Sequence, residues 1–395
     1  MKEPYQINVD ASILDDLQYR LARTRWPNEI DNENWQTGAN SNYLKEFCSY
    51  WWRDFDWRAQ EKHINSFPNF KTHIDGTGIH FIHEKGKGEH SVPLLLVHGF
   101  PDSFVRFLKV IPLLTEADED GFSFDVVVPS IPGFGFSDIP TQPGMNAQLI
   151  TSLFTKLMTD ELGYSRFIVQ GGDWGSSIAE HIAIHNPQFL EGMYLTDVPW
   201  YHLFAVPDAD LTKAEKDYLQ RGQAWSQKEG TYAIIQSTKP QSLAYGLNDS
   251  PSGLAGWIIE KFYSWSDCNG KLENCYTKDE LLTNLTIYWA TQTINSAMRI
   301  YYEAALVMPQ QMKQKIERPE VPVAIAMFPH DLVVAPRKFV ERIFNVHQWT
   351  EMPKGGHFAA MEQPELFTAD VRKFGKTLKG IVVEENVIHS RTDLL

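Results

Sequence analysis

The chain has 395 residues, enough for one large domain with an insertion or for two domains of medium size. With 43% hydrophobic and 22% charged residues its composition is ordinary for a soluble globular protein, and no apolar run approaches the roughly 20 residues that cross a bilayer. The formal net charge of −14 argues against nucleic acid or an anionic membrane surface as a partner, which leaves a small neutral molecule as the easier ligand.

The amino terminus and the cysteines indicate a cytoplasmic protein. MKEPYQINVDASILDDL lacks the apolar core of a signal peptide, so we expect neither secretion nor a membrane anchor. Cys48, Cys268 and Cys275 have no zinc-site spacing and form no disulfide framework, although the last two are close enough in sequence to bridge. A tripeptide that fits the glycosylation pattern begins at Asn284, but it lies in a helical-looking stretch and is expected to be accidental.

The first 70 residues are rich in helix signals and aromatic side chains. Asp10 can cap a helix that runs to about Arg23, because apolar residues then recur on one helical face. A second helical stretch lies near Tyr43 to Trp52. We therefore expect residues 1–70 to form an amino-terminal helical extension packed on the main body.

A strand pattern begins at residue 71. KTHIDGTGIHFIHEKG is typical of a hairpin, and three short apolar runs, VPLLLV, FDVVVP and RFIVQ, each end at a glycine-containing turn. Helical segments at about 148–162 and 176–185 separate them. Short buried strands alternating with helices predict the α/β class with a mostly parallel sheet, whose chemistry gathers where strands end.

The strand pattern stops after MYLTDVPW and returns with VPVAIAMF and HQWTEMPKGGHF. Between them, residues 201–318 are helical and rich in Trp and Tyr. A helical insertion between two strands of one sheet is typical of a cap over an active site. We therefore expect a core of residues 71–200 and 319–395 with a cap of residues 201–318.

The strongest chemical signal is GGDWG, directly after the strand FIVQ and before a helix. Small residues on both sides of Asp173 fit a nucleophile elbow, the sharp strand-to-helix turn that presents a reactive side chain. The usual occupant is serine, but the chain contains no G-x-S-x-G. The plainer alternative is an Asp that caps the following helix. The flanking glycines favour a nucleophilic Asp173.

HGFP follows the strand VPLLLV and is the candidate oxyanion hole. The alternative is a simple turn at the end of a strand. In the functional interpretation, the backbone N–H groups of Phe100 and Trp174 are the two donors. We expect the bond before Pro101 to be cis.

The candidate base is His357 in KGGHFAAMEQPE. Triads of this kind run nucleophile, acid, histidine in chain order, which puts the acid between Asp173 and His357. Asp331 after VPVAIAMF fits, and Asp197 after MYLT is the rival. His181 and His185 lack the glutamate of a zinc-protease motif and are expected to be ordinary helix residues, so no metal is predicted.

A carboxylate nucleophile restricts the reaction. Serine attacking a saturated carbon would leave an ether that water cannot readily cleave, whereas Asp173 leaves an ester. His357, oriented by an acid, can then activate water to attack the carboxyl carbon of Asp173. The substrate must therefore carry a leaving group on saturated carbon, which means an epoxide oxygen or a halide.

At these residues the chain resembles the microsomal-type epoxide hydrolases of the α/β-hydrolase fold. The likeness runs over nearly the whole chain through FDWRAQEKHINSFPNF, HGFPDSF, PSIPGFGFS, QGGDWGS, QSTKPQSLAYGLNDSPSGLAGWIIEKF and GGHFAAME. It implies opening of a small hydrophobic epoxide by water to a diol, without a cofactor. The implied nucleophile, acid and base are Asp173, Asp331 and His357. The implied donors to the epoxide oxygen are Tyr232 and Tyr301, although Tyr302 adjoins the second.

Two positions depart from the resemblance. Phe100 stands where family members commonly have Trp, and Asp102 stands where they have Gly; we expect a changed pocket wall or an added charge nearby. A haloalkane dehalogenase is the enzymatic alternative, because the indole of Trp174 could hold a halide, but its usual second donor replaces Phe100 with Asn. A non-catalytic receptor is the other alternative, disfavoured by the complete Asp–His–Asp set. Monomer and homodimer stay open.

Overall fold

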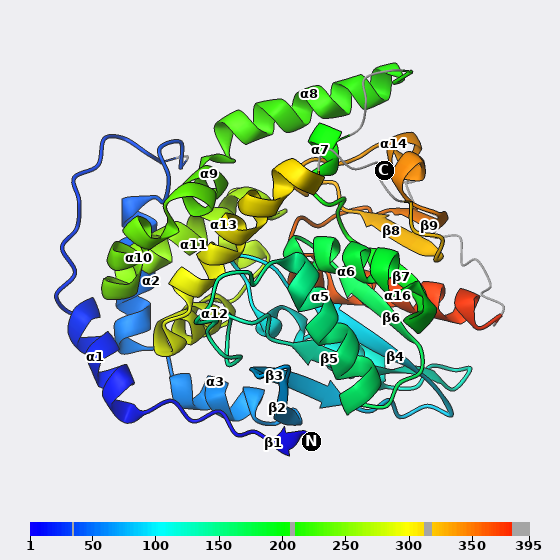
Figure 1. Cartoon of the computed structure of the whole chain (residues 1–395). Helices are drawn as coiled ribbons and strands as arrows, with labels where there is room; N and C mark the ends of the chain where they lie inside the picture. The colour runs from blue at the N-terminus through cyan, green and yellow to red at the C-terminus, as the bar shows by residue number, and fades with distance from the viewer. Residues whose placement is uncertain (34, 206–209, 312–317, 381–395) are drawn as a thin grey trace, which may run out of the picture.

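In the computed structural model, which describes residues 1–33, 35–205, 210–311 and 318–380, a nine-stranded sheet forms the centre (Figure 1). Its strand order is β1-β2-β3-β5-β4-β6-β7-β8-β9. The pairs from β5 to β9 are all parallel, and β1, β2 and β3 join one edge in antiparallel register. The strands are β1 (Glu3–Pro4), β2 (Asn69–Ile74), β3 (Thr77–Glu84), β4 (His90–Val97), β5 (Phe122–Pro129), β6 (Phe167–Gly171), β7 (Leu190–Leu195), β8 (Val323–Met327) and β9 (Val346–Glu351).

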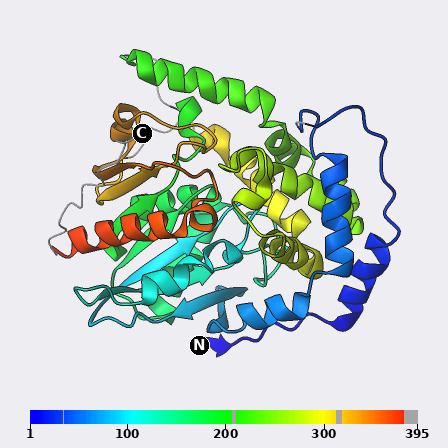
Figure 2. The same cartoon turned by 180° about the vertical axis from the view of Figure 1, so that it is seen from behind.

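Helices cover both faces of this sheet, which is why its central strands are continuous apolar runs. All residues of β5, β6 and β8 are buried. In Figures 1 and 2 one face carries α5 (Ala147–Lys156) and α6 (Trp174–His185), and the other carries α16 (Pro364–Leu378), which packs against α4 (Val110–Thr115). The predicted α/β class with a mostly parallel sheet is confirmed.

The amino-terminal segment folds as helices plus one strand that the sequence does not predict. Helices α1 (Ala11–Leu21) and α2 (Ser41–Arg53) form where expected, and a third helix, α3 (Trp57–Ile64), follows them. The Asp10 side chain accepts from the N–H of Ser12 to cap α1. β1 pairs with β2, and β2 itself begins at Asn69, inside the range that the sequence assigns to the extension. This segment therefore contributes to the edge of the sheet as well as packing on it.

Helices fill the stretch between the neighbouring strands β7 and β8. They are α7 (His202–Ala205), α8 (Lys213–Lys228), α9 (Thr231–Thr238), α10 (Pro240–Asp249), α11 (Pro251–Trp265), α12 (Lys278–Thr291) and α13 (Ile294–Gln311). Helices α1 and α2 lie against α11 of this insertion. Figure 1 shows the insertion beyond the carboxyl ends of the parallel strands, where chemistry is expected. Residues 206–209 and 312–317 of the expected cap and 381–395 of the expected core lie outside the described residues.

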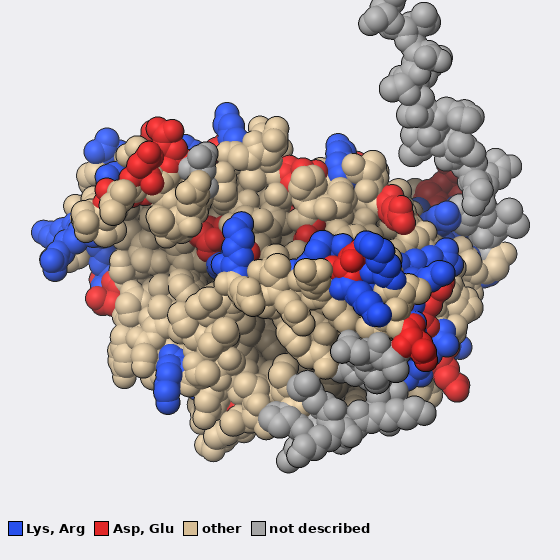
Figure 3. All heavy atoms as spheres, turned by 90° about the horizontal axis from the view of Figure 1, so that it is seen from above, with Lys and Arg blue, Asp and Glu red and all other residues tan. Residues whose placement is uncertain are grey.

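After β8, α14 (Arg337–Ile343) leads to β9, and α15 (Ala359–Glu362) precedes α16. Among the described residues, no helix combines the length and the apolar character that crossing a membrane requires. Figure 3 shows the face that carries α8. Acidic and basic side chains are interspersed there, and the described residues in this view form no continuous basic band of the kind that binds nucleic acid.

Candidate active site

Asp173 stands at a strained turn between β6 and α6. Its φ of 58° and ψ of −127° lie where side chains other than glycine are rarely found. The turn also requires its small neighbours: a Cβ on Gly175 would lie 2.1 Å from the carbonyl oxygen of Val97. A Cβ on Gly99 of the facing loop would lie 2.2 Å from Asp173 Oδ1. The glycines therefore allow two backbone segments to close around one carboxylate.

Two backbone N–H groups point at one oxygen of that carboxylate. Asp173 Oδ1 accepts from Phe100 N–H at 2.8 Å and from Trp174 N–H at 2.7 Å. A capping Asp accepts from the second or third N–H of its helix, whereas Trp174 is the first residue of α6 and Phe100 belongs to a distant loop. This geometry differs from that of an ordinary cap and fits the arrangement predicted for an oxyanion hole. The Phe100–Pro101 bond is cis, as expected.

His357 lies on the other side of the carboxylate. Its Nδ1 is 2.7 Å from Asp331 Oδ1, and its Nε2 is 3.5 Å from Asp173 Oδ2. The first separation is a short charge-assisted hydrogen bond, and the second is longer than a normal hydrogen bond. His357 is thus oriented by Asp331 and faces the oxygen of Asp173 that the two N–H groups leave free.

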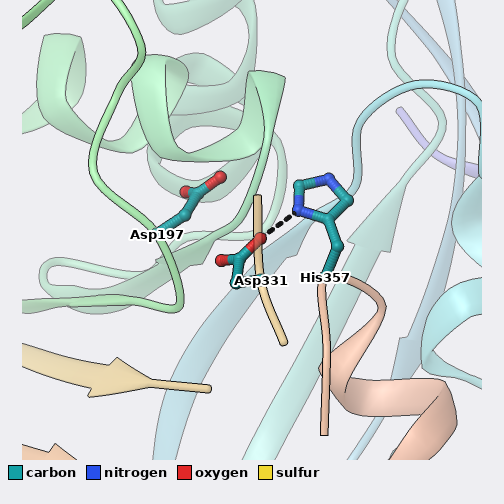
Figure 4. Close-up of side chains that lie close together, drawn as sticks. All are labelled: Asp197, Asp331 and His357. Carbon is teal, nitrogen blue, oxygen red and sulfur yellow. Dashed lines mark hydrogen bonds and ion pairs between the residues drawn. The ribbon is translucent and has the colours of Figure 1, made fainter. Parts of the chain in front are cut away.

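Asp197 lies beside this group but has a different partner. Its Oδ2 accepts the backbone N–H of Asp173 at 2.8 Å, so it supports the elbow instead of the imidazole. Figure 4 shows Asp331, and not Asp197, joined to His357 by a hydrogen bond. Possible metal-ligand atoms, one each from Asp197, Asp331 and His357, lie within 4.8 Å of one another, a spacing that could hold a cation. However, Asp331 Oδ1 and His357 Nδ1 bind each other, and Asp197 Oδ2 accepts a backbone N–H, so only some of the possible ligand atoms are free.

The charged side chains around His357 and Asp197 shift the pKa values of both residues. Burial alone would lower the pKa of His357, but the charges of Asp331 and Asp173 outweigh it and raise the pKa to about 10. Burial raises the pKa of Asp197, and the nearby charge of Asp331 raises it further. Before any substrate reacts, His357 is therefore held as a cation between two carboxylates.

Tyr232 of α9 and Tyr301 of α13 lie over the elbow from the insertion. Their ring centroids are 5.9 Å apart, and the Phe100 ring lies 6.2 Å from Tyr232 and 5.7 Å from Tyr301. Tyr301 also meets the Trp174 indole edge-on at 4.9 Å. Burial raises the pKa of both phenols, and the charge of Asp173 adds to it. Both hydroxyls therefore keep their protons at neutral pH and can donate hydrogen bonds.

Comparison with known proteins shows which family the chain belongs to. A family described as Epoxide hydrolase N terminus matches residues 2–107, and one described as alpha/beta hydrolase fold matches residues 92–364. Epoxide hydrolase 1 of Sus scrofa is 37% identical over 402 residues, which cover 94% of this chain and 88% of that protein. The chain belongs to the epoxide hydrolase family. The α/β-hydrolase fold expected from the resemblance is confirmed, and the dehalogenase and receptor alternatives are set aside.

Solved structures agree with this assignment. The juvenile hormone epoxide hydrolase of the silkworm Bombyx mori superposes with a TM-score of 0.88 at 30% identity, covering 96% of this chain and 95% of that one. The epoxide hydrolase of Aspergillus niger superposes with a TM-score of 0.83 at 27% identity, covering 96% and 97%. The likeness therefore includes the amino-terminal segment and the helical insertion as well as the sheet.

The structure corrects the expectation for Asp102 and agrees with the expectation that the glycosylation pattern at Asn284 is accidental. Asp102 adds no free charge to the pocket: it is buried and forms an ion pair with Arg106 at 2.8 Å. Asn284 is not exposed for glycosylation, because it is buried and donates to the carbonyl oxygen of Pro101 at 2.8 Å. The three cysteines are all free, so Cys268 and Cys275 do not bridge.

Sequence reasoning missed two neighbours of the site. Arg106 donates to the backbone carbonyl oxygen of His357 at 2.7 Å. Its charge stands four residues after Asp102 in an otherwise apolar run, and this spacing is a signal that could have revealed the pair. Trp265 packs edge-on against His357 at 5.4 Å and lies 5.2 Å from the Tyr232 ring. One Trp among the 12 of the chain carries no such signal.

Proposed function

We propose that this epoxide hydrolase opens a hydrophobic epoxide to a vicinal diol through a covalent ester on Asp173. The observation that carries the proposal is that the two carboxylate oxygens of Asp173 have different surroundings. Oδ1 of Asp173 is held by two backbone N–H groups, while Oδ2 is directed toward His357 at 3.5 Å. One oxygen is thus placed for stabilisation and the other for attack.

Ring opening is the first step. Oδ2 of Asp173 attacks an epoxide carbon, the carbon–oxygen bond of the ring breaks, and the leaving oxygen takes a proton from a phenol. Tyr232 and Tyr301 are the donors, because they overhang Asp173 and a phenol with a pKa near or above about 10 suits a strongly basic alkoxide. General acids of this kind typically contribute about 10²–10⁴ in rate.

Ester hydrolysis is the second step. Esterification removes the negative charge of Asp173, one of the charges that raise the pKa of His357. The imidazole can then pass its proton to the tyrosinate left by ring opening and accept a proton from water as that water attacks the carboxyl carbon of Asp173. When the intermediate collapses, the bond from this carbon to Oδ2 breaks, the departing diol oxygen takes a proton from His357, and the second proton of the water restores the imidazolium. Negative charge develops on Oδ1, where Phe100 N–H and Trp174 N–H are already in place. Asp331 holds the imidazole in orientation throughout.

The pocket wall supports a hydrophobic substrate of moderate size. Aromatic rings contributed by the core and the insertion surround the reacting groups: Phe100, Trp174, Tyr232, Trp265 and Tyr301. We propose that residues 201–318 act as the cap of a core made of residues 71–200 and 319–395, with residues 1–70 as an extension. We also propose a cytoplasmic location, in keeping with the free thiols of Cys48, Cys268 and Cys275.

The decisive test is the origin of the added oxygen. With enzyme in excess over styrene oxide in ¹⁸O-labelled water, the diol from a single turnover should carry little label. The label should instead appear in the Asp173 side chain, located in the peptide that contains QGGDWGS. Under many turnovers the diol becomes labelled, because each hydrolysis refills the carboxylate with solvent oxygen.

The contrary result is equally clear. A fully labelled diol from the first turnover, with no label in the peptide, would mean that the enzyme only activates water. Asp197→Asn is the control variant, since Asp197 binds the backbone of the elbow and not the reacting oxygen. It should give the same isotope pattern as the wild-type enzyme.

A further inference from the structure

Asp102 and Arg106 form a buried ion pair beneath the active site. Both side chains are almost inaccessible, at 1% and 2% exposure, and Arg106 Nη1 donates to Asp102 Oδ2 at 2.8 Å. Burial alone would lower the pKa of Arg106, but the charge of Asp102 outweighs it. Because two buried charges are costly unless their hydrogen bonds are satisfied, their other contacts indicate what the pair does.

The Asp102 end holds the loop that carries an oxyanion donor. Asp102 Oδ1 accepts the backbone N–H of Gly99 at 3.0 Å, directly before Phe100. Its own carbonyl oxygen accepts from the Tyr288 hydroxyl at 2.9 Å. Asn284 donates to the carbonyl oxygen of Pro101. The backbone on both sides of Phe100 is therefore fixed, and with it the direction of the Phe100 N–H.

The Arg106 end reaches the other two parts of the catalytic group. Nη2 donates to the backbone carbonyl oxygen of His357 at 2.7 Å. The same nitrogen would lie 3.2 Å from a Cβ placed on Gly172, next to Asp173, so the guanidinium packs directly against the elbow. One planar side chain thus connects the oxyanion loop, the histidine loop and the nucleophile turn. Lysine could not reproduce this, because its single nitrogen lacks the fixed fork of arginine.

We propose that Asp102 and Arg106 are a positioning pair that sets the Phe100 N–H and the His357 backbone in the arrangement needed for ester hydrolysis. This inference rests on the proposed covalent mechanism. The pair acts mainly on the second step, because negative charge develops on Oδ1 only when water attacks the ester. During ring opening Oδ1 merely keeps its hydrogen bonds while Oδ2 reacts.

The test separates the two steps in single turnovers of styrene oxide. Intact-protein mass spectrometry follows formation and decay of the ester in the wild-type enzyme, Asp102→Asn and Arg106→Lys. We expect ester decay to slow about 10- to 100-fold, since complete loss of one oxyanion donor typically costs about 10²–10³. Ester formation should change less than about threefold, so the ester accumulates.

Asp370→Asn is the matched control. Asp370 is another buried aspartate, on α16, and its hydrogen bonds run to Tyr194 and Thr350 on the sheet. It should lower the unfolding temperature without changing the ratio of the two rates. If a single variant fails to fold because one charge is left unpaired, the double variant Asp102→Asn/Arg106→Gln removes both charges and should show the same slow ester decay.

Two different failures can be told apart. If the wild-type enzyme never carries an ester on Asp173, the proposed function is wrong. If the wild-type ester forms but the folded variants slow both steps equally or neither, the mechanism stands and the pair has only a structural role.

Discussion

The core around the sheet and the helical insertion hold the proposed reactive groups in different ways. In the core, Asp173, Asp331 and His357 are positioned by hydrogen bonds of 2.7–2.8 Å and by glycines that no larger residue could replace. In the insertion, Tyr232 and Tyr301 are positioned by aromatic rings with centroids 4.9–6.2 Å away. Hydrogen bonds constrain direction closely, whereas contacts between aromatic rings leave room for adjustment.

This contrast suggests that the two parts of the molecule serve different steps of the proposed reaction. Ester hydrolysis involves the same atoms whatever epoxide has reacted, so a rigid core suits it. In the proposed mechanism, ring opening depends on the shape of the epoxide, so proton donors on packed helices, whose positions substitution can shift, suit that step. Variants of His357 and Asp331 should therefore stall the enzyme after ring opening, and variants of Tyr232 and Tyr301 should stall it before.

The largest effect is expected for His357→Gln. Ring opening continues because Asp173 needs no base, but the ester persists because water lacks its activator. Diol turnover should fall by about 10³–10⁴, near the upper range for a general base. Intact-mass measurement should find one adduct per active site. His181→Gln, a substitution in α6 of the same core, is the control and should turn over normally. Unmodified His357→Gln with undiminished turnover would disprove the assignment.

The cap variant should fail in the opposite way. Tyr232→Phe combined with Tyr301→Phe removes both donors while keeping the rings, and diol turnover should fall by about 10³. No ester should accumulate, since the carbon–oxygen bond does not break. Tyr302→Phe is the matched control, because Tyr302 adjoins Tyr301 but is 39% exposed. Wild-type turnover in the double variant would remove the tyrosines from the mechanism.

The same division explains how much the sequence could predict. Asp173 was recognisable because a strand, glycines and a helix must surround an elbow, and such backbone constraints leave local patterns. The parallel sheet was recognisable from its apolar runs for the same reason. The tyrosines entered only through resemblance, since a Tyr on a helix carries no local mark of what it faces.

Two further points depended on long-range contacts. Asp331 and Asp197 both follow strands, and only the 2.7 Å bond to His357 separates them. Strand β1 has two residues, and it exists because β2 offers an edge to pair with. Neither the choice of acid nor the existence of β1 can be predicted from the local periodicity of apolar residues or from a sequence motif.

Within the core, variants of Asp331 and Asp197 should differ in diol turnover, by less than the variants above. Asp331→Asn should lower diol turnover by about 10²–10³, because the imidazole loses its orienting charge and can adopt the wrong tautomer. Asp197→Asn should lower it by less than about tenfold, because an amide oxygen can still accept the N–H of Asp173. Steady-state assays at one pH suffice. A larger loss for Asp197→Asn would exchange the two roles.

The smallest expected effect is on pH dependence. It tests whether the rates of ring opening and of ester hydrolysis respond differently to the protonation of His357. The charges of Asp331 and Asp173 raise the pKa of His357 to about 10, so in the free enzyme the imidazole is protonated at neutral pH. Ring opening requires no proton from His357. Its rate should therefore be nearly constant from roughly pH 6.5 to roughly pH 10, the ordinary pKa values of His and of Tyr.

Ester hydrolysis needs the neutral imidazole, so its rate should rise with pH, by at most about tenfold per unit, and then level off. Because the ester carries no charge on Asp173, the midpoint of this rise should lie below the pKa of the free enzyme. Single-turnover measurements of ester formation and decay with styrene oxide, from roughly pH 6.5 to above the free-enzyme pKa of about 10, give both profiles. A decay midpoint that remains at the free-enzyme value would mean that Asp173 contributes nothing to the proton affinity of His357. The 3.5 Å approach of Oδ2 to Nε2 would then have no electrostatic consequence.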